Sequence, residues 1–324
     1  MILDDNPPQT QSKFFNLDEI AQGVYVAIAI KEKGVIGNAG IIDLGNRTLV
    51  FDTFETPIIS EDLRIASEKK TSQSAEFVIN SHSHPDHWFG NQVFSNTAVF
   101  ISSQDAFSSM TPYIEEVRED KENPAELEEE VRSLLNQFDT ESDEIKRQQL
   151  AVSIARWQLY LNSLSDLELK LPDQTFKGNL KIHGNLRSVE IFDSGHVHTP
   201  GDVCLGLPRE KILFIGDIGF FNEQPYMEDS NPSNWKAFLN ELRNSEYNFF
   251  VPGHGPIGTK ENLRQMVEYI ELLETLVSDA VNQGKHMKSI LEQDLPEPFA
   301  TWTLGSSRLE VNCKIMFDQY LESK

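Results

Sequence analysis

Short apolar runs rich in Val, Ile and Phe recur along the first hundred residues and again between residues 180 and 251. Runs of this length that end at Gly-Asn pairs or other polar turns are typical of β-strands. Gly37-Asn38 and Gly45-Asn46 separate the early runs, which predicts a β-meander. The predicted strands cover residues 24–30, 39–44, 48–52, 76–80, 98–101, 180–183, 188–192, 203–207, 211–215 and 248–251.

Between these two groups of strands, apolar residues recur instead at helical spacing. The segment 123–126, Asn-Pro-Ala-Glu, combines a capping residue, a first-turn proline and an acid, and Leu127 and Val131 continue the helical pattern. A second amphipathic helix follows, so we expect a helical hairpin inserted at about residues 104–168. The hairpin either packs on its own domain or serves as a lid or dimerisation element. We favour packing on its own domain, because the apolar face of an amphipathic helix usually packs in the core.

The order of the predicted elements indicates the fold class. Further helices are expected at residues 59–70, 235–243, 262–280 and 307–323. Strands, helices, strands and helices follow one another, with hairpins in both halves, which favours two packed sheets with helices outside over a single parallel sheet. We expect one domain over residues 14–324, preceded by a mobile tail at residues 1–13.

Composition and charge narrow the range of partners. The chain has 28 Lys and Arg against 51 Asp and Glu, a formal net charge of −23. Such a surface repels phosphate backbones and anionic lipid, so we expect no nucleic acid or membrane partner and favour a small-molecule substrate. The two cysteines are far apart and imply no disulfide framework. Since the polar N-terminus lacks the apolar run of a signal peptide, we predict a cytoplasmic protein.

The string His82-Ser83-His84-Pro85-Asp86-His87 is the strongest chemical signal in the chain. It follows the predicted strand at 76–80, and imidazole and carboxylate groups at a strand end suit Zn²⁺, Fe²⁺ or Mn²⁺. Three later strands also end in glycine-containing turns that carry ligand-type residues. These turns span residues 195–202 with His196 and His198, residues 216–217 with Asp217, and residues 252–256 with His254.

With these four motifs in this order, the chain resembles the metallo-β-lactamase-fold metallo-hydrolase superfamily over roughly residues 20–260. The resemblance implies a four-layer αββα sandwich with a two-metal site along one edge of the sheets. It also implies His198 rather than His196 as a ligand, because His198 directly precedes Thr-Pro-Gly-Asp. The implied ligands are His82, His84 and His198 for one metal, Asp86, His87 and His254 for the other, and Asp217 as the bridge.

The resemblance further implies a dinuclear hydrolase, with zinc as the first choice of metal and Mn²⁺ or Fe²⁺ as alternatives. A metal-bridging hydroxide would attack the carbonyl of a small ester, thioester, lactone or lactam, with Asp86 orienting it. A phosphodiesterase or a mononuclear-iron sulfur dioxygenase on the same fold is the alternative, and a non-catalytic metal-binding interaction protein is a third hypothesis. Lactone-hydrolysing members carry a tyrosine where this chain has Phe220, which weakens the lactonase interpretation.

Several residues near the motifs are candidates for supporting roles. Asp52 ends a predicted strand and could accept a hydrogen bond from a ligand imidazole, and His196 could also lie just outside the ligand set. Phe220, Tyr226 and Met227 closely follow Asp217, so we expect them at the mouth of the site, beside an apolar part of the substrate. A homodimer formed through the helical insertion is a further possibility.

Overall fold

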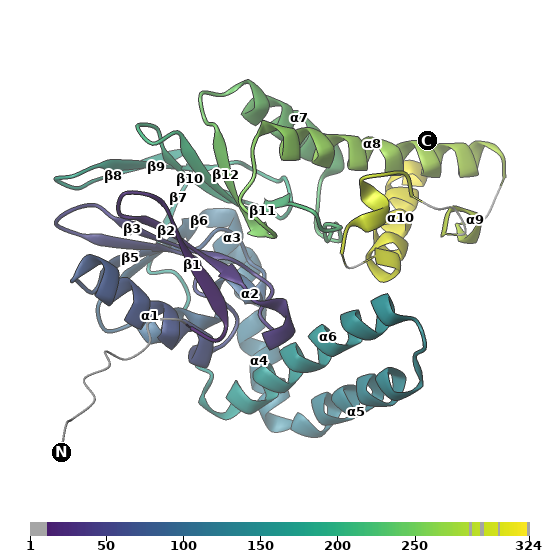
Figure 1. The fold of residues 1–324 in the computed structure, drawn as a ribbon, viewed down its shortest axis with the longest axis horizontal. Coiled ribbons are helices and arrows are strands. Elements are labelled where there is room, and N and C mark those ends of the chain that lie inside the picture. The colour runs from purple at the N-terminus through teal and green to yellow at the C-terminus, as the bar shows by residue number, and fades with distance from the viewer. Residues whose placement is uncertain (1–11, 285–286, 292–294, 304, 323–324) are drawn as a thin grey trace, which may run out of the picture.

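The computed structural model describes residues 12–284, 287–291, 295–303 and 305–322. Most of the predicted mobile tail at residues 1–13 therefore falls outside the described residues. In the described part, two β-sheets pack face to face (Figure 1). The twelve strands are β1 Phe15–Ala21, β2 Val24–Ala29, β3 Ala39–Asp43, β4 Thr48–Phe51, β5 Ala75–Ile79, β6 Val99–Ser103, β7 Gln174–Phe176, β8 Asn179–His183, β9 Ser188–Asp193, β10 Val203–Leu207, β11 Ile212–Phe220 and β12 Phe249–His254.

The first sheet runs in the order β1-β2-β3-β4-β5-β6-β7. Strands β2 to β4 form the predicted antiparallel meander, β1 extends it at the edge, and β4 to β7 are parallel. Parallel neighbours need crossover connections, and helix α1, Pro57–Thr71, supplies the one between β4 and β5. Since β4, β5 and β6 are parallel, the loops after all three strands leave from one edge of the sheet.

The second sheet runs in the order β12-β11-β10-β9-β8. Strands β8 to β11 are antiparallel, and β12 pairs in parallel with β11. Helix α7, Pro232–Asn244, lies within the crossover between β11 and β12. Both strands are longer than predicted, because their pairing continues through the glycine-containing segments that we had expected to be turns.

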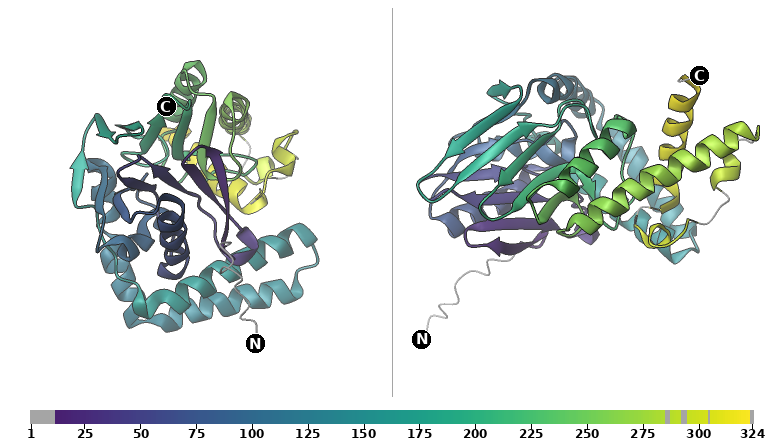
Figure 2. Two further views of the ribbon diagram at one scale, coloured as in Figure 1. Left: turned by 60° about the vertical axis from the view of Figure 1, so that its left-hand side comes forward. Right: turned by 90° about the horizontal axis from the view of Figure 1, so that it is seen from above.

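Apolar side chains fill three layers, which confirms the predicted αββα sandwich. The inner faces of the two sheets enclose one cluster, in which the rings of Phe51 and Phe214 lie 5.5 Å apart. Ile59 and Leu63 of α1 pack on the outer face of the first sheet. Helices α7 and α8 (Lys260–Asn282) cover the second sheet, and α10 (Gly305–Glu322) packs against α8, as Figure 2 shows.

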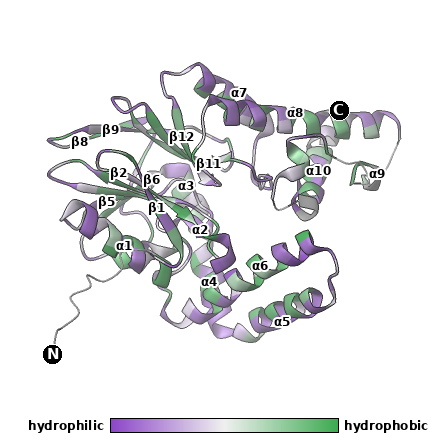
Figure 3. Cartoon of the chain, in the orientation of Figure 1, coloured by the Kyte–Doolittle hydropathy of each residue, from purple (hydrophilic) through white to green (hydrophobic). Residues whose placement is uncertain are grey.

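The segment expected to be a hairpin contains four helices. These are α3 Gln104–Met110, α4 Tyr113–Glu122, α5 Pro124–Thr140 and α6 Glu144–Ser163. Helices α5 and α6 form the hairpin itself, and Figure 3 shows mixed hydrophobic and hydrophilic residues along both. Asn123 holds the predicted N-cap position of α5, but its side chain makes no capping hydrogen bond.

Two contacts fix the helical insertion to the sandwich. The base packs around the buried Trp88 and Phe89, which directly follow the histidine string. Farther along α6, the turn at Gly34 approaches the helix so closely that a Cβ at this residue would lie 2.5 Å from the carbonyl carbon of Ala155. The insertion is therefore anchored beside the motif loops.

The described part of the chain contains two strands that the hydrophobic pattern did not predict, β1 and the short edge strand β7. Strand β1 includes Asp18 and Glu19, so its apolar alternation is weak. Among the helices of the described part, including α8 with its 23 residues, none has an apolar stretch long enough to span a membrane.

Replacing Phe214 by alanine should lower the free energy of unfolding by about 3–5 kcal/mol, because its ring is 1% exposed and fills the space between the sheets. Phe249 on the neighbouring strand β12 is 49% exposed and provides the matched control. Phe249→Ala should cost well under about 1 kcal/mol, as most surface substitutions do. Urea unfolding followed by circular dichroism compares the two, and equal losses would contradict the assigned core.

Candidate metal centre

The histidine string lies in the loop that leaves the carboxyl end of β5. His84 is the N-cap of the short helix α2, Pro85–Trp88, and Pro85 takes the first helical position, where no backbone N–H is required. Asp86 and His87 follow in the first turn of this helix, and the ring centroids of His82 and His87 lie 4.4 Å apart. All four side chains are buried or nearly so.

Asp217 and His254 come from the parallel pair β11 and β12 in the other sheet. Gly216, with φ of +49°, accompanies a register shift in β11 just before Asp217. Across from it, a Cβ on Gly253 would lie 1.8 Å from Asp217 Oδ1. The lack of a side chain at residue 253 therefore allows the Asp217 carboxylate to lie against the neighbouring strand.

His198 is held in a turn organised by one buried carboxylate. Asp202 accepts hydrogen bonds from the backbone N–H of His198 (2.6 Å) and of Thr199 (3.0 Å), and from the Thr199 hydroxyl (2.7 Å). Burial raises the pKa of Asp202 to about 7, although these hydrogen bonds act in the opposite direction. The structure thus explains the Thr-Pro-Gly-Asp segment as the support of His198.

The structure brings the seven predicted ligand residues together. They form two groups, within each of which one donor atom per residue lies within 4.8 Å of the others. The first group contains four residues and the second contains three: His82, His84, His198 and Asp217 in the first, and Asp86, His87 and His254 in the second.

Asp217 lies between the two groups. Its Oδ2 is 3.5 Å from His82 Nε2 and 3.4 Å from His198 Nε2. The same carboxylate reaches the second group, with His254 Nε2 3.1 Å from Oδ2 and His87 Nε2 3.1 Å from Oδ1. A single carboxylate therefore faces imidazoles of both groups, as a bridging ligand must.

The unpartnered atoms at this centre fit a bound cation. Buried polar atoms are normally hydrogen-bonded, yet several atoms facing the centre have no hydrogen-bond partner. They belong to both groups and include imidazole nitrogens and carboxylate oxygens: His82 Nε2, His87 Nε2, Asp86 Oδ2 and Asp217 Oδ1. Nitrogen and oxygen donors of this kind bind zinc and other divalent transition metals.

Protonation states favour metal binding at His82 and Asp217 and oppose it at His87. Burial lowers the pKa of His82 to about 3, so its imidazole is neutral near pH 7. Burial alone would raise the pKa of Asp217, but His254, His87 and His82 outweigh it and hold the pKa well below its usual value. Burial opposes the charged form of His87, yet Asp217, Asp86 and Asp52 raise its pKa well above the usual range. Metal binding at His87 therefore has to displace a proton.

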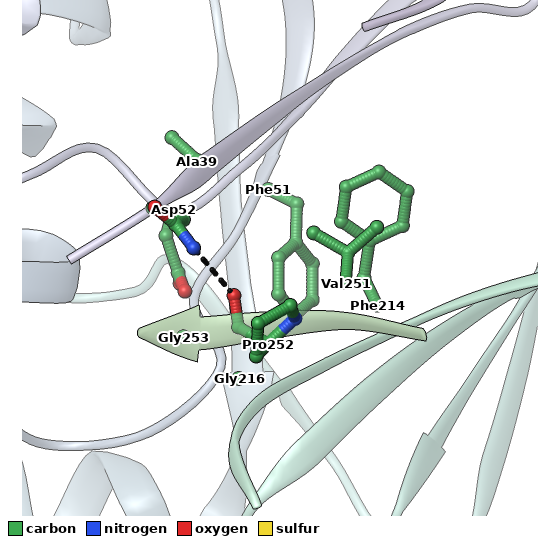
Figure 4. Close-up of a pocket in the computed structure, with 9 residues that line it drawn as sticks. Ala39, Phe51, Asp52, Phe214, Gly216, Val251, Pro252 and Gly253 are labelled. Atoms are coloured by element: carbon green, nitrogen blue, oxygen red, sulfur yellow. Dashed lines mark hydrogen bonds between the residues drawn. The ribbon is translucent and has the colours of Figure 1, made fainter. Parts of the chain in front are cut away.

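Asp52 links the two groups through hydrogen bonds, made directly or through Ser81, to imidazole nitrogens that face away from the centre. Its Oδ2 lies 2.9 Å from His87 Nδ1 and accepts a hydrogen bond from the Ser81 hydroxyl at 2.8 Å. The Ser81 hydroxyl in turn lies 2.8 Å from His82 Nδ1. Asp52 has φ of +60° and 1% exposure, and Figure 4 shows it beyond the end of β4 beside Gly253. The expected position of Asp52 next to a ligand imidazole is thus the one observed.

Asn38, which we read only as a turn residue, ties the two sheets together beside the centre. Its side-chain amide donates to the carbonyl oxygens of Pro252 (3.0 Å) and Gly255 (2.9 Å), which flank His254. The first of these bonds is the dashed line in Figure 4. Asn38 Oδ1 accepts from the backbone N–H of Ala29, in the first sheet, at 3.1 Å. No local pattern marks this role, since Pro252 and Gly255 are more than 200 positions away from Asn38.

Asp229 is another residue that the sequence did not single out. Its carboxylate lies 3.1 Å from His84 Nε2, which leaves His84 Nδ1 facing the first group. His196 Nε2 lies 2.7 Å from the Asp229 carbonyl oxygen and is exposed, so His196 stands outside both groups. Its connection to the centre runs through Asp229 and His84.

A cavity of about 300 Å³ opens beside the two groups. Phe220 and Tyr226 line it, and the Phe220 ring stacks on His254 with centroids 4.7 Å apart. Met227 is not among the residues that line it, because its side chain is fully buried in the apolar cluster under α7 and α8. The far wall carries Arg156 of α6 and Arg308 of α10, neither of which the motifs indicated.

One protein-family model matches the sequence of this chain. The family model described as the metallo-beta-lactamase superfamily matches residues 33–254, well over half of the chain. No match was found among the curated proteins.

Solved structures share the fold at low identity. The metallo-beta-lactamase FIM-1 from Pseudomonas aeruginosa, in its mono-zinc form, is 15% identical with a TM-score of 0.56, over 81% of this chain and 96% of that one. A metallo-beta-lactamase from Pontibacter korlensis is 15% identical (TM-score 0.54), over 79% of this chain and 99% of that one. One from Erythrobacter litoralis is 13% identical (TM-score 0.54), over 80% and 97%.

Replacing Asp52 by asparagine should weaken metal binding about 10- to 100-fold, the usual cost of losing a carboxylate behind a ligand imidazole. Asparagine tolerates the positive φ at this position, so the fold should survive. Chelator competition with zinc-loaded protein measures the affinity. Asp43→Asn at the end of β3, whose carboxylate caps Gly45 instead, is the control and should bind zinc like the wild type. Equal affinities in all three proteins would contradict the role of Asp52.

Proposed function

Because the chain belongs to the metallo-beta-lactamase superfamily, we propose that it is a two-metal hydrolase of small esters, thioesters, lactones or lactams. The observation that carries this proposal is the position of Asp217, whose carboxylate faces imidazoles of both ligand groups. A site for one metal would not require a carboxylate buried between two separate sets of histidines. The cavity beside the groups has the size of a small-molecule site.

The candidate ligand residues form two sets, each of which would hold one cation. His82, His84 and His198 would hold one, Asp86, His87 and His254 the other, and Asp217 would contact both. Bound there, two divalent cations would supply a hydroxide nucleophile at neutral pH and polarise the substrate carbonyl. The predominance of imidazole favours zinc, and Mn²⁺ or Fe²⁺ fits the same donors.

We assign to Asp86 the role of accepting a hydrogen bond from the attacking water. Its Oδ2 is buried, lies 3.2 Å from His87 Nε2 and 3.3 Å from His254 Nε2, and belongs to the wall of the cavity. Burial alone would raise its pKa, but His87 and His254 keep it well below the usual value, so Asp86 stays anionic. An anionic oxygen at this place can accept a hydrogen bond from water and orient it toward the cavity.

Other parts of the chain bind and enclose the substrate. Phe220, flat against His254, and Tyr226 provide apolar surface beside the ligand groups. Tyr113 and Arg156 of the helical insertion complete the opposite wall together with Arg308 of α10. Since sandwich, insertion and C-terminal helix all contribute to one cavity, we propose that residues 14–324 act as a single domain on a small molecule. A homodimer through the insertion stays a prediction.

Metal-loaded protein should hydrolyse chromogenic esters, thioesters, lactones or nitrocefin, and removal of metal by a chelator should abolish turnover. Asp217→Asn should lower the amount of the second metal bound per chain. It should also lower kcat/KM by more than about 10- to 100-fold, the loss typical of removing a group that supports a metal ligand from behind. The exposed Asp105→Asn on α3 should leave both unchanged. Elemental analysis and steady-state kinetics on the same samples test this.

The alternatives predict different results in the same experiment. One iron per chain with oxidation of a thiol substrate would indicate the sulfur dioxygenase. Turnover of bis(4-nitrophenyl) phosphate alone would indicate a phosphodiesterase. Two metals per chain without turnover of any substrate would favour a non-catalytic metal-binding protein.

A further inference from the structure

The cavity beside the ligand groups contains two guanidinium groups that differ in their partners. Arg156 of α6 forms a two-point pair with Glu55, at 2.7 and 2.8 Å. Arg308 of α10 has no hydrogen bond or ion pair with any described residue; its guanidinium carbon lies 4.5 Å from the ring centroid of Tyr226. The Arg156 guanidinium is therefore neutralised by Glu55, whereas the Arg308 guanidinium is available to bind a ligand.

An unpaired guanidinium in a cavity is an unfavourable arrangement. Burial lowers the pKa of Arg308 below its usual value, and the nearby Arg156 adds to the effect. The carboxylates that act in the opposite direction are Asp86, Asp217 and Glu223. A group held partly out of water beside a like charge needs a counter-charge, and the described residues supply no dedicated one.

None of the nearby carboxylates is a free partner in the metal-loaded protein. Asp86 and Asp217 would be taken up by the cations, and Glu223 is paired with Lys31. Asp229 also lines the cavity, but its carboxylate interacts with His84. With two divalent cations in place the cavity is thus locally positive, in a chain whose net charge is −23.

The C-terminal helix is fixed so that Arg308 faces this cavity. Asn312, four positions later and hence on the same helix face, donates to the carbonyl oxygen of Pro225 (2.8 Å) and lies 3.2 Å from Tyr269 Oη. The backbone of Thr303 also pairs with the segment after Asp217, accepting from Gln224 N at 3.1 Å. Arg308 is therefore positioned by the fold and is not simply a surface side chain.

A second donor lies in the same wall. The hydroxyl of Tyr113 has no hydrogen-bond partner among the described residues, and its ring packs edge-on against Trp88 and Phe89. Burial raises the pKa of Tyr113, and the acids Glu116, Asp229 and Asp86 add to this, so the phenol keeps its proton. A protonated hydroxyl and a guanidinium that lack acceptors in one cavity match an anion with several oxygens.

We propose that Arg308 binds a carboxylate of the substrate and makes the enzyme selective for substrates that carry one at a distance from the scissile carbonyl. A guanidinium fork matches carboxylate geometry through two parallel hydrogen bonds. The inference rests on the proposed hydrolase function, and it concerns a helix outside residues 33–254, the part of the chain matched by the family. Phe220 and Tyr226 would then contact the apolar part between the two ends.

The test compares two chromogenic esters of similar size with zinc-loaded protein. Mono-4-nitrophenyl glutarate carries a free carboxylate, and 4-nitrophenyl butyrate is neutral. Arg308→Gln should lower kcat/KM for the glutarate ester about 10- to 100-fold, as expected for a charge-assisted hydrogen bond, mainly through KM. Turnover of the butyrate ester should change less than about threefold. Equal losses for both esters, or no loss for either, would overturn the proposal.

Two further variants control for charge and folding. Arg308→Lys keeps the charge but not the fork, so it should keep part of the preference for the glutarate ester and still be measurable if the glutamine variant does not fold. Arg264→Gln on α8 removes an arginine that is paired with Glu261 and Glu268 away from the cavity, and it should behave as the wild type. A lysine variant indistinguishable from wild type on both esters would contradict recognition through the fork.

Binding separates this proposal from the hydrolase function itself. If the wild type hydrolyses neither ester, calorimetric titration with glutarate still measures the anion site. Glutarate that binds the zinc-loaded wild type and binds Arg308→Gln at least about tenfold more weakly would support the role of Arg308 while the hydrolase proposal fails. Equal glutarate affinity in the two proteins would overturn the role of Arg308, whatever the enzyme hydrolyses. Benzenesulfonate and inorganic phosphate, titrated in parallel, show whether the preference is for carboxylate; tighter binding of either would overturn that assignment.

Discussion

The burial of the Asp217 carboxylate among imidazoles is the interaction on which the rest of the site depends. A buried charge is tolerated only when it is paired, and the ion-pair partners of Asp217 among the described residues are histidines drawn from the loop after β5, the turn at His198 and the end of β12. These segments belong to different sheets and are up to 172 positions apart (254 − 82 = 172). The centre can therefore form only when both sheets are packed.

This dependence explains why so much of the polar structure around the centre links the two sheets. Asn38 in the first sheet holds the backbone on both sides of His254, and Asp52 at the end of β4 holds His87 and Ser81. The close approach also leaves no room for a Cβ at Gly253. Ligand geometry here is a consequence of sheet packing, so a change at these contacts alters the metal centre without touching a ligand.

The candidate ligands could be found in the sequence because each follows an apolar strand, while their division into two sets bridged by Asp217 came from the resemblance to the superfamily. The same reasoning failed for Met227, which adjoins Tyr226 but points into the core. It also missed Asn38 and Asp229, whose partners are set by tertiary packing and leave no local pattern. Strand β11 ran past its predicted end, because pairing with β12 overrides the turn preference of Gly216.

The sandwich and its additions contribute different things to the cavity. The loops and strand ends of the two sheets supply the seven candidate metal ligands. The insertion and α10 supply Tyr113, Arg156 and Arg308, which face the ligand groups from the other side. Fold alone does not determine substrate, and these two helical elements carry the polar groups that no ligand motif requires. Specificity in this chain is therefore expected to follow the helices that wall the cavity, while the reaction type follows the sheets that build the metal centre.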